Sequence, residues 1–281
     1  MTPRYEELAP PAELAAHVHC LWRFEFDEAG VEQAVPPDGR TELIVDLATP
    51  YEERNAAGGW DVQPRLLFAG QLTRPLVLRS RGPVSVLGVR FTPAGAWAFV
   101  DGPLSACNDR RIDVAALHGA GAAAALAAAL DRAGSSGDAD AAARARRDVV
   151  AAYVAGQIAR RDGRRDAAVE RCVALLQGSE GRVALAELVA ASGLGERQLQ
   201  RRFAEVVGIS PRALGGVIRL RRVFEALRDS PLASWSELAQ AAGFFDHPQM
   251  ARDFRRLIGR TPTHWAQAGP GLAASLADAD A

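Results

Sequence analysis

Short segments with alternating apolar and polar positions fill the first ninety residues. The clearest is LWRFEF at 21–26, and similar segments rich in apolar and β-branched residues lie at 41–47, 65–69, 76–79 and 84–91. A two-residue period is typical of half-buried β-strands. Turn-forming sequences such as PPDG at 36–39 separate the segments. The pattern predicts an amino-terminal β-rich, sandwich or barrel-like domain.

The periodicity becomes helical after Pro93. Thr92 and Pro93 have the residue types of an N-cap and a first helical position, which predicts a helix start there. Alanine-rich segments predict helices over 114–132 and 139–161, with a flexible GSSG joint at 134–137. A further helix is predicted over 165–177. We expect these connecting helices to pack on the β-rich domain or to form dimer contacts.

A repeat of about fifty residues follows. The first copy combines EL at 187–188 with Gly193, LQRRF at 199–203 and a Gly-x-x-Pro sequence at 208–211. The second combines EL at 237–238 with Gly243, MARDF at 250–254 and Gly-x-x-Pro at 259–262. The offset is 50 up to the first glycine and 51 afterwards, so the second copy has one extra residue in its turn.

Each copy predicts a helix-turn-helix. An apolar stripe at helical spacing precedes each glycine, which suits the left-handed end of a helix. A second helix follows, over about 197–206 in the first copy. Ser210 and Pro211 then predict the start of a long helix over 211–228 that links the copies, and Thr261-Pro262 the start of a final short helix.

Charge distinguishes this repeat from the rest of the chain. The formal net charge is only −1, and every basic residue is an arginine. Residues 182–265, however, hold 13 arginines and eight acidic residues, whereas residues 1–181 have a net charge of −4. This asymmetry is typical of a nucleic-acid reader joined to another domain. Two helices held about 34 Å apart would enter successive major grooves, where base edges are distinguishable.

These motifs resemble the AraC/XylS-type transcriptional regulators. LQRRF at 199–203, GISP at 208–211, GFFD at 243–246 and Phe254-x₄-Gly259-x-x-Pro262 carry the resemblance over about residues 183–265. The amino-terminal part resembles the sensor-type domain of one branch of these regulators through VPPDGRTELI at 35–44, FAG at 68–70 and GVRFTPAG at 88–95. The resemblance implies an α+β fold with a carboxy-terminal, seven-helix, all-α double helix-turn-helix. It also implies three parts: a sensor and dimerisation domain with a helical extension (1–164), a DNA-binding domain (165–266) and a flexible tail (267–281).

The resemblance places the base contacts on the second helix of each copy. Because arginine suits guanine and glutamine suits adenine, the candidates are Arg197, Gln198, Gln200 and Arg201, then His247, Gln249 and Arg252. Pro248 departs from the usual polar residue, so the second reader is expected to be less base-specific or to hold mostly phosphate. Basic residues near helix ends often contact phosphate, which makes candidates of Arg202, Arg219, Arg221, Arg255, Arg256 and Arg260. Each competes with an intramolecular salt bridge as an alternative.

The sequence gives little indication of metal binding, disulfides or an aromatic ligand site. His17-x-His19 would place two imidazoles on one strand face, but no third ligand is evident nearby, so we expect no metal and no cofactor. Cys20, Cys107 and Cys172 are too scattered for a disulfide framework. The aromatic residues Trp22, Phe24, Phe68, Trp97 and Phe99 are expected in the core rather than around a ligand. No signal peptide or membrane span is expected, which makes a cytoplasmic protein the default.

The sequence thus predicts a non-enzymatic regulator that binds double-stranded promoter DNA. Its effector is expected to be an unidentified small molecule or another effector that acts at the amino-terminal domain, in an unknown pocket. RNA polymerase and a second copy of the chain are possible partners. Two alternatives stay open. One is a β-barrel enzyme with an accessory DNA module, and the other is a module that docks a protein partner without DNA.

Overall fold

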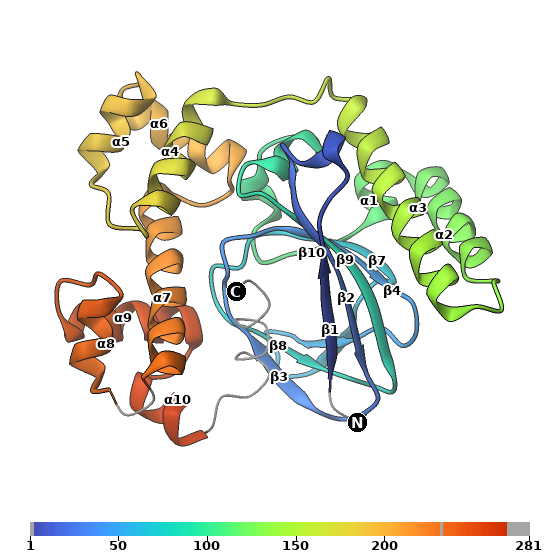
Figure 1. Cartoon of the computed structure of the whole chain (residues 1–281), viewed down its shortest axis with the longest axis horizontal. Helices are drawn as coiled ribbons and strands as arrows, with labels where there is room; N and C mark the ends of the chain where they lie inside the picture. The colour runs from blue at the N-terminus through green and yellow to red at the C-terminus, as the bar shows by residue number, and fades with distance from the viewer. Residues whose placement is uncertain (1–2, 231–232, 269–281) are drawn as a thin grey trace.

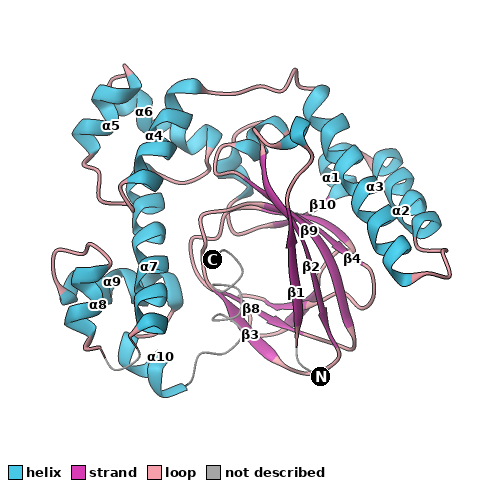
Figure 2. Ribbon diagram, viewed as in Figure 1, coloured by secondary structure: helices cyan, strands magenta, loops and turns pink. Residues whose placement is uncertain are grey.

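Two antiparallel sheets form the amino-terminal part of the protein, as seen in a computed structural model that describes residues 3–230 and 233–268 (Figures 1 and 2). The larger sheet has the order β1-β2-β9-β4-β7-β10, and the smaller has the order β3-β8-β5-β6. The strands of the larger sheet are β1 (Arg4–Leu8), β2 (Val18–Phe26), β9 (Val84–Phe91), β4 (Glu42–Asp46), β7 (Leu66–Ala69) and β10 (Arg111–Asp113). Those of the smaller are β3 (Glu32–Val35), β8 (Leu76–Arg79), β5 (Glu52–Arg54) and β6 (Trp60–Val62).

The alternation along β2 and β9 supplies both faces of the larger sheet. Leu87, Val89 and Phe91 pack into a core shared with helices outside the sheet. Trp22 and Val86 point the other way, into an aromatic cluster between the sheets. Trp22 is paired across the ladder with Gly88, where an added Cβ would lie only 2.1 Å from the indole ring. Gly88 therefore leaves the space that the indole occupies.

Three helices cover the outer face of the larger sheet (Figure 1). They are α1 (Val114–His118), α2 (Ala120–Ala133) and α3 (Ala139–Ala159). The prediction of one helix over 114–132 is wrong at its start, because Gly119 adopts φ +90° and separates α1 from α2. The predicted helix at Thr92 is also wrong, and only a 3₁₀ turn forms at Gly95–Ala98. The hydroxyl of Thr92 donates to the carbonyl oxygen of His17, 3.3 Å away, instead of capping a helix.

The carboxy-terminal part is all-helical and confirms the predicted α+β class. Its elements are α4 (Ala167–Gly178), α5 (Leu185–Ser192), α6 (Glu196–Val206), α7 (Pro211–Asp229), α8 (Trp235–Ala241), α9 (His247–Ile258) and α10 (Pro262–Ala268). Helices α5–α6 and α8–α9 form the two helix-turn-helix units, and α7 joins them (Figure 1). Each unit has its own core, around Leu199 and Phe203 in one and around Met250 and Phe254 in the other.

The predicted tail over 267–281 lies outside the described residues from position 269 onward. Residues 267 and 268 belong to α10. Within the described residues, no helix combines the length and the apolar character needed to cross a lipid bilayer.

Candidate nucleic-acid interface and inter-domain cavity

The turns before α6 and α9 differ as the sequence predicts. Gly193 ends α5 in the left-handed conformation with φ +71°, and Gly195 is the N-cap of α6. In the second unit the N-cap of α9 is Asp246, whose carboxylate accepts a hydrogen bond from the Gln249 backbone N–H at 2.6 Å. The capping carboxylate orders the first turn of α9.

The outward face of α6 carries the predicted base-contact residues. Arg197, Gln198, Gln200 and Arg201 are all exposed, and Leu199 and Phe203 are fully buried beneath them. The carboxamide nitrogen of Gln200 donates to Glu196 at 3.0 Å. Arg197 and Arg201 have no ion-pair partner within the described part of the chain. Both guanidinium groups are therefore available to a ligand.

The outward face of α9 has a similar composition. His247 and Arg252 are exposed, and Arg252 has no ion-pair partner among residues 3–230 and 233–268. Gln249 is half-buried, and its side-chain oxygen accepts a hydrogen bond from the Phe245 backbone N–H at 3.0 Å. Arg201 and Arg252 thus both lie on the surface, on the second helix of their respective units.

The six phosphate candidates fall into two groups. Arg255, Arg256 and Arg260 are exposed at or after the end of α9, and Arg256 also contacts Asp253 at 3.2 Å. The other three are engaged within the protein. Arg202 donates through Nε to the buried carboxylate of Asp166 at 2.6 Å.

Arg219 and Arg221 also have internal positions. The Arg219 side chain is only 14% exposed, donates to the Gly181 carbonyl oxygen and lies 5.2 Å from the centre of the Phe244 ring. Arg221 lines a cavity between α7 and the sheets. The partners of Arg219 are distant in sequence, so the sequence spacing gave no signal of them.

A cavity of about 190 Å³ lies between the two sheets and is closed on one side by α7. Its sheet walls are mainly apolar and include Trp22, Phe24 and Val86. From α7 come Val217, Leu220 and Phe224. Trp22 and Phe24 are buried core residues, as expected, but they also line the cavity, whereas Phe68 and Phe99 are fully buried in the core. The sequence signal for the cavity was the cluster of aromatic residues on the inner face of β2.

Charged groups of the cavity are largely paired. Arg90 contacts both Glu7 and Glu42 at 2.9 Å, and burial raises the pKa of Glu42 against the opposing effect of the Arg90 guanidinium. Arg111 donates two hydrogen bonds to Glu53, at 2.6 and 2.7 Å. Its remaining nitrogen, Nη1, is buried without a hydrogen-bond partner. This nitrogen is an unused donor on a residue of the cavity wall.

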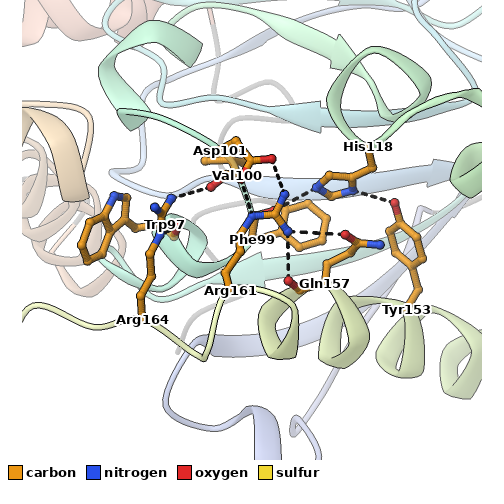
Figure 3. A network of polar contacts seen from close by, with 9 residues as sticks. All are labelled: Trp97, Phe99, Val100, Asp101, His118, Tyr153, Gln157, Arg161 and Arg164. Carbon is orange, nitrogen blue, oxygen red and sulfur yellow. Dashed lines mark hydrogen bonds and ion pairs between the residues drawn. The ribbon is translucent and has the colours of Figure 1, made fainter.

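Arginines also fix the segment that joins the two parts of the chain (Figure 3). Arg161 pairs with Asp101 at 2.6 Å. Arg164 lies over the Trp97 ring and donates to the carbonyl oxygens of Trp97 and Val100, at 2.7 and 2.6 Å. Deeper in the same network, His118 contacts the hydroxyl of Tyr153 at 2.7 Å, and burial lowers the pKa of this imidazole (Figure 3).

The predicted geometry of His17 and His19 is wrong. A register shift in the β2–β9 ladder between Val18 and Cys20 breaks the alternation, so His17 is buried and His19 exposed. His19 instead approaches Glu7 and Cys20, with one ligand atom from each within 4.8 Å of the others. The Arg90 guanidinium lies 2.9 Å from the Glu7 carboxylate, which disfavours a cation there.

The chain is similar to several solved structures. Among solved structures, a "probable AraC family transcriptional regulator" from Rhodopseudomonas palustris CGA009 is 25% identical over 36% of this chain and 95% of its own, with a TM-score of 0.33. ToxT from Vibrio cholerae is 8% identical over 96% of this chain and 100% of its own, with a TM-score of 0.47. A ToxT structure with a bound unsaturated fatty acid, from strain SCE256, is 11% identical over 86% of this chain and 92% of its own, with a TM-score of 0.46. A comparison of the chain with curated proteins found no match.

Two protein-family models match parts of the chain. One described as a domain of unknown function (DUF6597) matches residues 6–113, within the β-rich part. Another, described as a helix-turn-helix domain, matches residues 188–268, which hold both repeat copies. The carboxy-terminal part of the chain therefore carries an AraC-type helix-turn-helix domain, and the amino-terminal part carries a DUF6597 domain.

Proposed function

We propose that this regulator reads specific DNA sequences with the exposed faces of α6 and α9. The observation that carries the proposal is the repetition of one arrangement in both units: an exposed arginine, Arg201 or Arg252, on a helix whose opposite face is the core. A helix of this kind fits the major groove, and an arginine there donates to guanine O6 and N7. The exposed Arg255, Arg256 and Arg260 supply phosphate contacts that fix the position without reading sequence.

The test starts from DNA fragments selected from a random pool by the full-length protein. We expect Arg201→Ala and Arg252→Ala each to lose about 1–3 kcal/mol of binding free energy and to relax sequence choice, measured by fluorescence anisotropy. Arg144→Ala, an exposed arginine of α3, is the matched control. Wild-type affinity in both variants would contradict the groove assignment.

Salt dependence separates DNA reading from the docking of a protein such as RNA polymerase. Binding to DNA releases counterions, so affinity should fall steeply between 50 and 200 mM salt. A flat response would favour the protein partner.

We propose further that the cavity binds an apolar small molecule. Its mainly apolar walls support this class of ligand. Because α7 forms part of the wall, a ligand would act on the arrangement of the two readers, to the extent that it binds one arrangement more tightly. Binding of a fluorescent apolar probe, anilinonaphthalene sulfonate, tests the site. Leu78→Trp should abolish the signal by filling the cavity, and Leu175→Ala, at an exposed position of α4, should leave it unchanged.

We also propose a domain boundary at 164/165, which falls between the end of α3 at Ala159 and the start of α4 at Ala167. Dimerisation through the amino-terminal domain is a further prediction. Sedimentation of the full chain tests it directly.

A further inference from the structure

The residue that distinguishes the two repeat copies is Phe245. Leu194 and Phe244 both follow the glycine of their turns and both pack into a core. Gly195 and Asp246 are both N-caps. The extra residue of the second copy is therefore Phe245, and its side chain is 93% exposed.

This exposure has no explanation within the fold. An apolar residue before an N-cap often packs on the fourth residue of the helix and fixes the entry of the chain. Here that fourth residue is Met250, which is already fully buried in the second core. Phe244 supplies the apolar contact of the turn, and Phe245 is left in solvent.

The backbone at Phe245 is held in place nevertheless. Its N–H donates to the side-chain oxygen of Gln249 at 3.0 Å, and the next residue, Asp246, caps α9. The engaged oxygen also changes the role of Gln249. A bidentate contact to adenine needs both the oxygen and the nitrogen of the carboxamide, so in this arrangement Gln249 positions Phe245 rather than reading adenine.

From this geometry, and resting on the proposed function, we infer that Phe245 recognises a thymine methyl group in the major groove entered by α9. The side chain sits at the amino-terminal end of α9, and recognition helices contact base edges with their amino-terminal residues. In the major groove the thymine methyl is the apolar group, and phenylalanine is one of the side chains that contacts it. The exposed residues of α9 are His247 and Pro248 next to the turn, and Arg252, Arg255 and Arg256 further along the helix. This cationic surface fits DNA better than an apolar protein patch.

The experiment uses the full chain and the DNA site selected with it. Each thymine of the part bound by the second unit is replaced in turn by deoxyuridine, which lacks only the methyl group. For wild type, we expect one position to weaken binding about three- to fivefold, the amount set by burial of one methyl. Phe245→Ala should weaken binding to the thymine site by a similar factor and should not discriminate thymine from deoxyuridine at that position. Phe245→Leu should keep part of the discrimination, and Leu175→Ala, another exposed apolar residue, should keep all of it.

Each outcome is decisive. If wild type binds no DNA, the proposed function itself fails. If wild type binds DNA but discrimination at every thymine survives in Phe245→Ala, the thymine contact is overturned while the proposed function stands. If Phe245→Ala keeps its DNA affinity and loses only transcription by added RNA polymerase, Phe245 docks a protein and the inference is likewise overturned.

Discussion

The side-chain amide of Asn108 donates a hydrogen bond to the backbone carbonyl oxygen of Gly208, and the two atoms are 2.7 Å apart. Asn108 belongs to the amino-terminal part, whereas Gly208 follows α6. The contact ties the first helix-turn-helix unit directly to the part of the chain that contains most of the cavity wall. The two parts are therefore joined by a direct hydrogen bond in addition to the connecting chain.

Replacement of Gly208 by alanine should be destabilising. Gly208 is buried with φ +92°, and an added Cβ would lie 2.9 Å from Oδ1 of Asn108. Backbone strain of this kind costs about 1–3 kcal/mol. We expect a lower midpoint in urea unfolding, with a smaller effect, about 1 kcal/mol, for Asn108→Ala. Gly178→Ala is a control, because nothing lies within 4 Å of its added Cβ. Equal stability of Gly208→Ala and wild type would refute the proposed strain.

Arg202→Ala should act mainly on folding. The Asp166 carboxylate is buried, accepts from the backbone N–H groups of Ala168 and Val169, and loses its arginine partner in this variant. Because the Arg202 side chain is 40% exposed, the expected loss is about 1–3 kcal/mol rather than the full cost of a buried pair. Urea unfolding measures it. Arg201→Ala, one residue away, should instead leave stability unchanged and weaken DNA binding. Unchanged stability and weakened DNA binding in Arg202→Ala would show that Arg202 belongs to the DNA surface.

Stability should fall as pH rises through the range of Asp46. Burial raises the pKa of this carboxyl to about 7, and both of its oxygens are buried without hydrogen-bond partners. The unfolded carboxyl titrates near 4, so between about pH 4 and pH 7 the folded state holds a proton that the unfolded state has lost. The free energy of unfolding therefore falls progressively as the pH rises to 7, by about 4 kcal/mol at most.

Asp46→Asn removes this titration. Its thermal midpoint should exceed that of wild type at pH 8 and approach it at pH 5. Asp27→Asn, at an exposed acidic position, should not change the slope with pH. A parallel pH profile for Asp46→Asn and wild type would contradict the assignment to Asp46.

Gly88→Ala should disturb the cavity. The added Cβ would lie 2.1 Å from the Trp22 ring, whose Nε1 donates to Glu42 at 3.0 Å. The indole must shift, at a cost of about 1–3 kcal/mol for overpacking. We expect reduced thermal stability together with altered binding of the apolar probe, since Trp22 lines the cavity. Gly58→Ala tests backbone strain alone, because its site has φ +84° and open space. Unchanged probe binding in Gly88→Ala would exclude Trp22 from the probe site.

Local patterns predicted the helical part well. Gly193 ends a helix in the left-handed conformation, and Ser210 accepts a hydrogen bond from the Ala213 N–H, as their residue types indicate. These features depend on a few neighbouring residues. The long strands also follow from alternation, whereas short ones such as β5 and β10 carry too few residues for a period to show.

Long-range pairing limited the prediction of the site. Arg202 and Arg219 pair with partners 36 and 38 residues away. In the sequence, such arginines look the same as arginines that are exposed to solvent. The cavity was missed for the same reason, since its walls come from β2, β9 and α7 together. The repeat showed that the second turn has one extra residue. It did not show that Phe244 would be buried in the core and Phe245 exposed.

Helix α7 is both a wall of the cavity and the spacer between the two readers. Its 19 residues make a rod of about 28 Å at 1.5 Å per residue. A tilt of about 5° at one end would displace the other by about 2 Å over that length, enough to carry a guanidinium into or out of reach of a base edge. If the two units bind neighbouring major grooves as proposed, filling or emptying this cavity of about 190 Å³ would set whether both units fit their grooves in phase with the helical repeat of DNA.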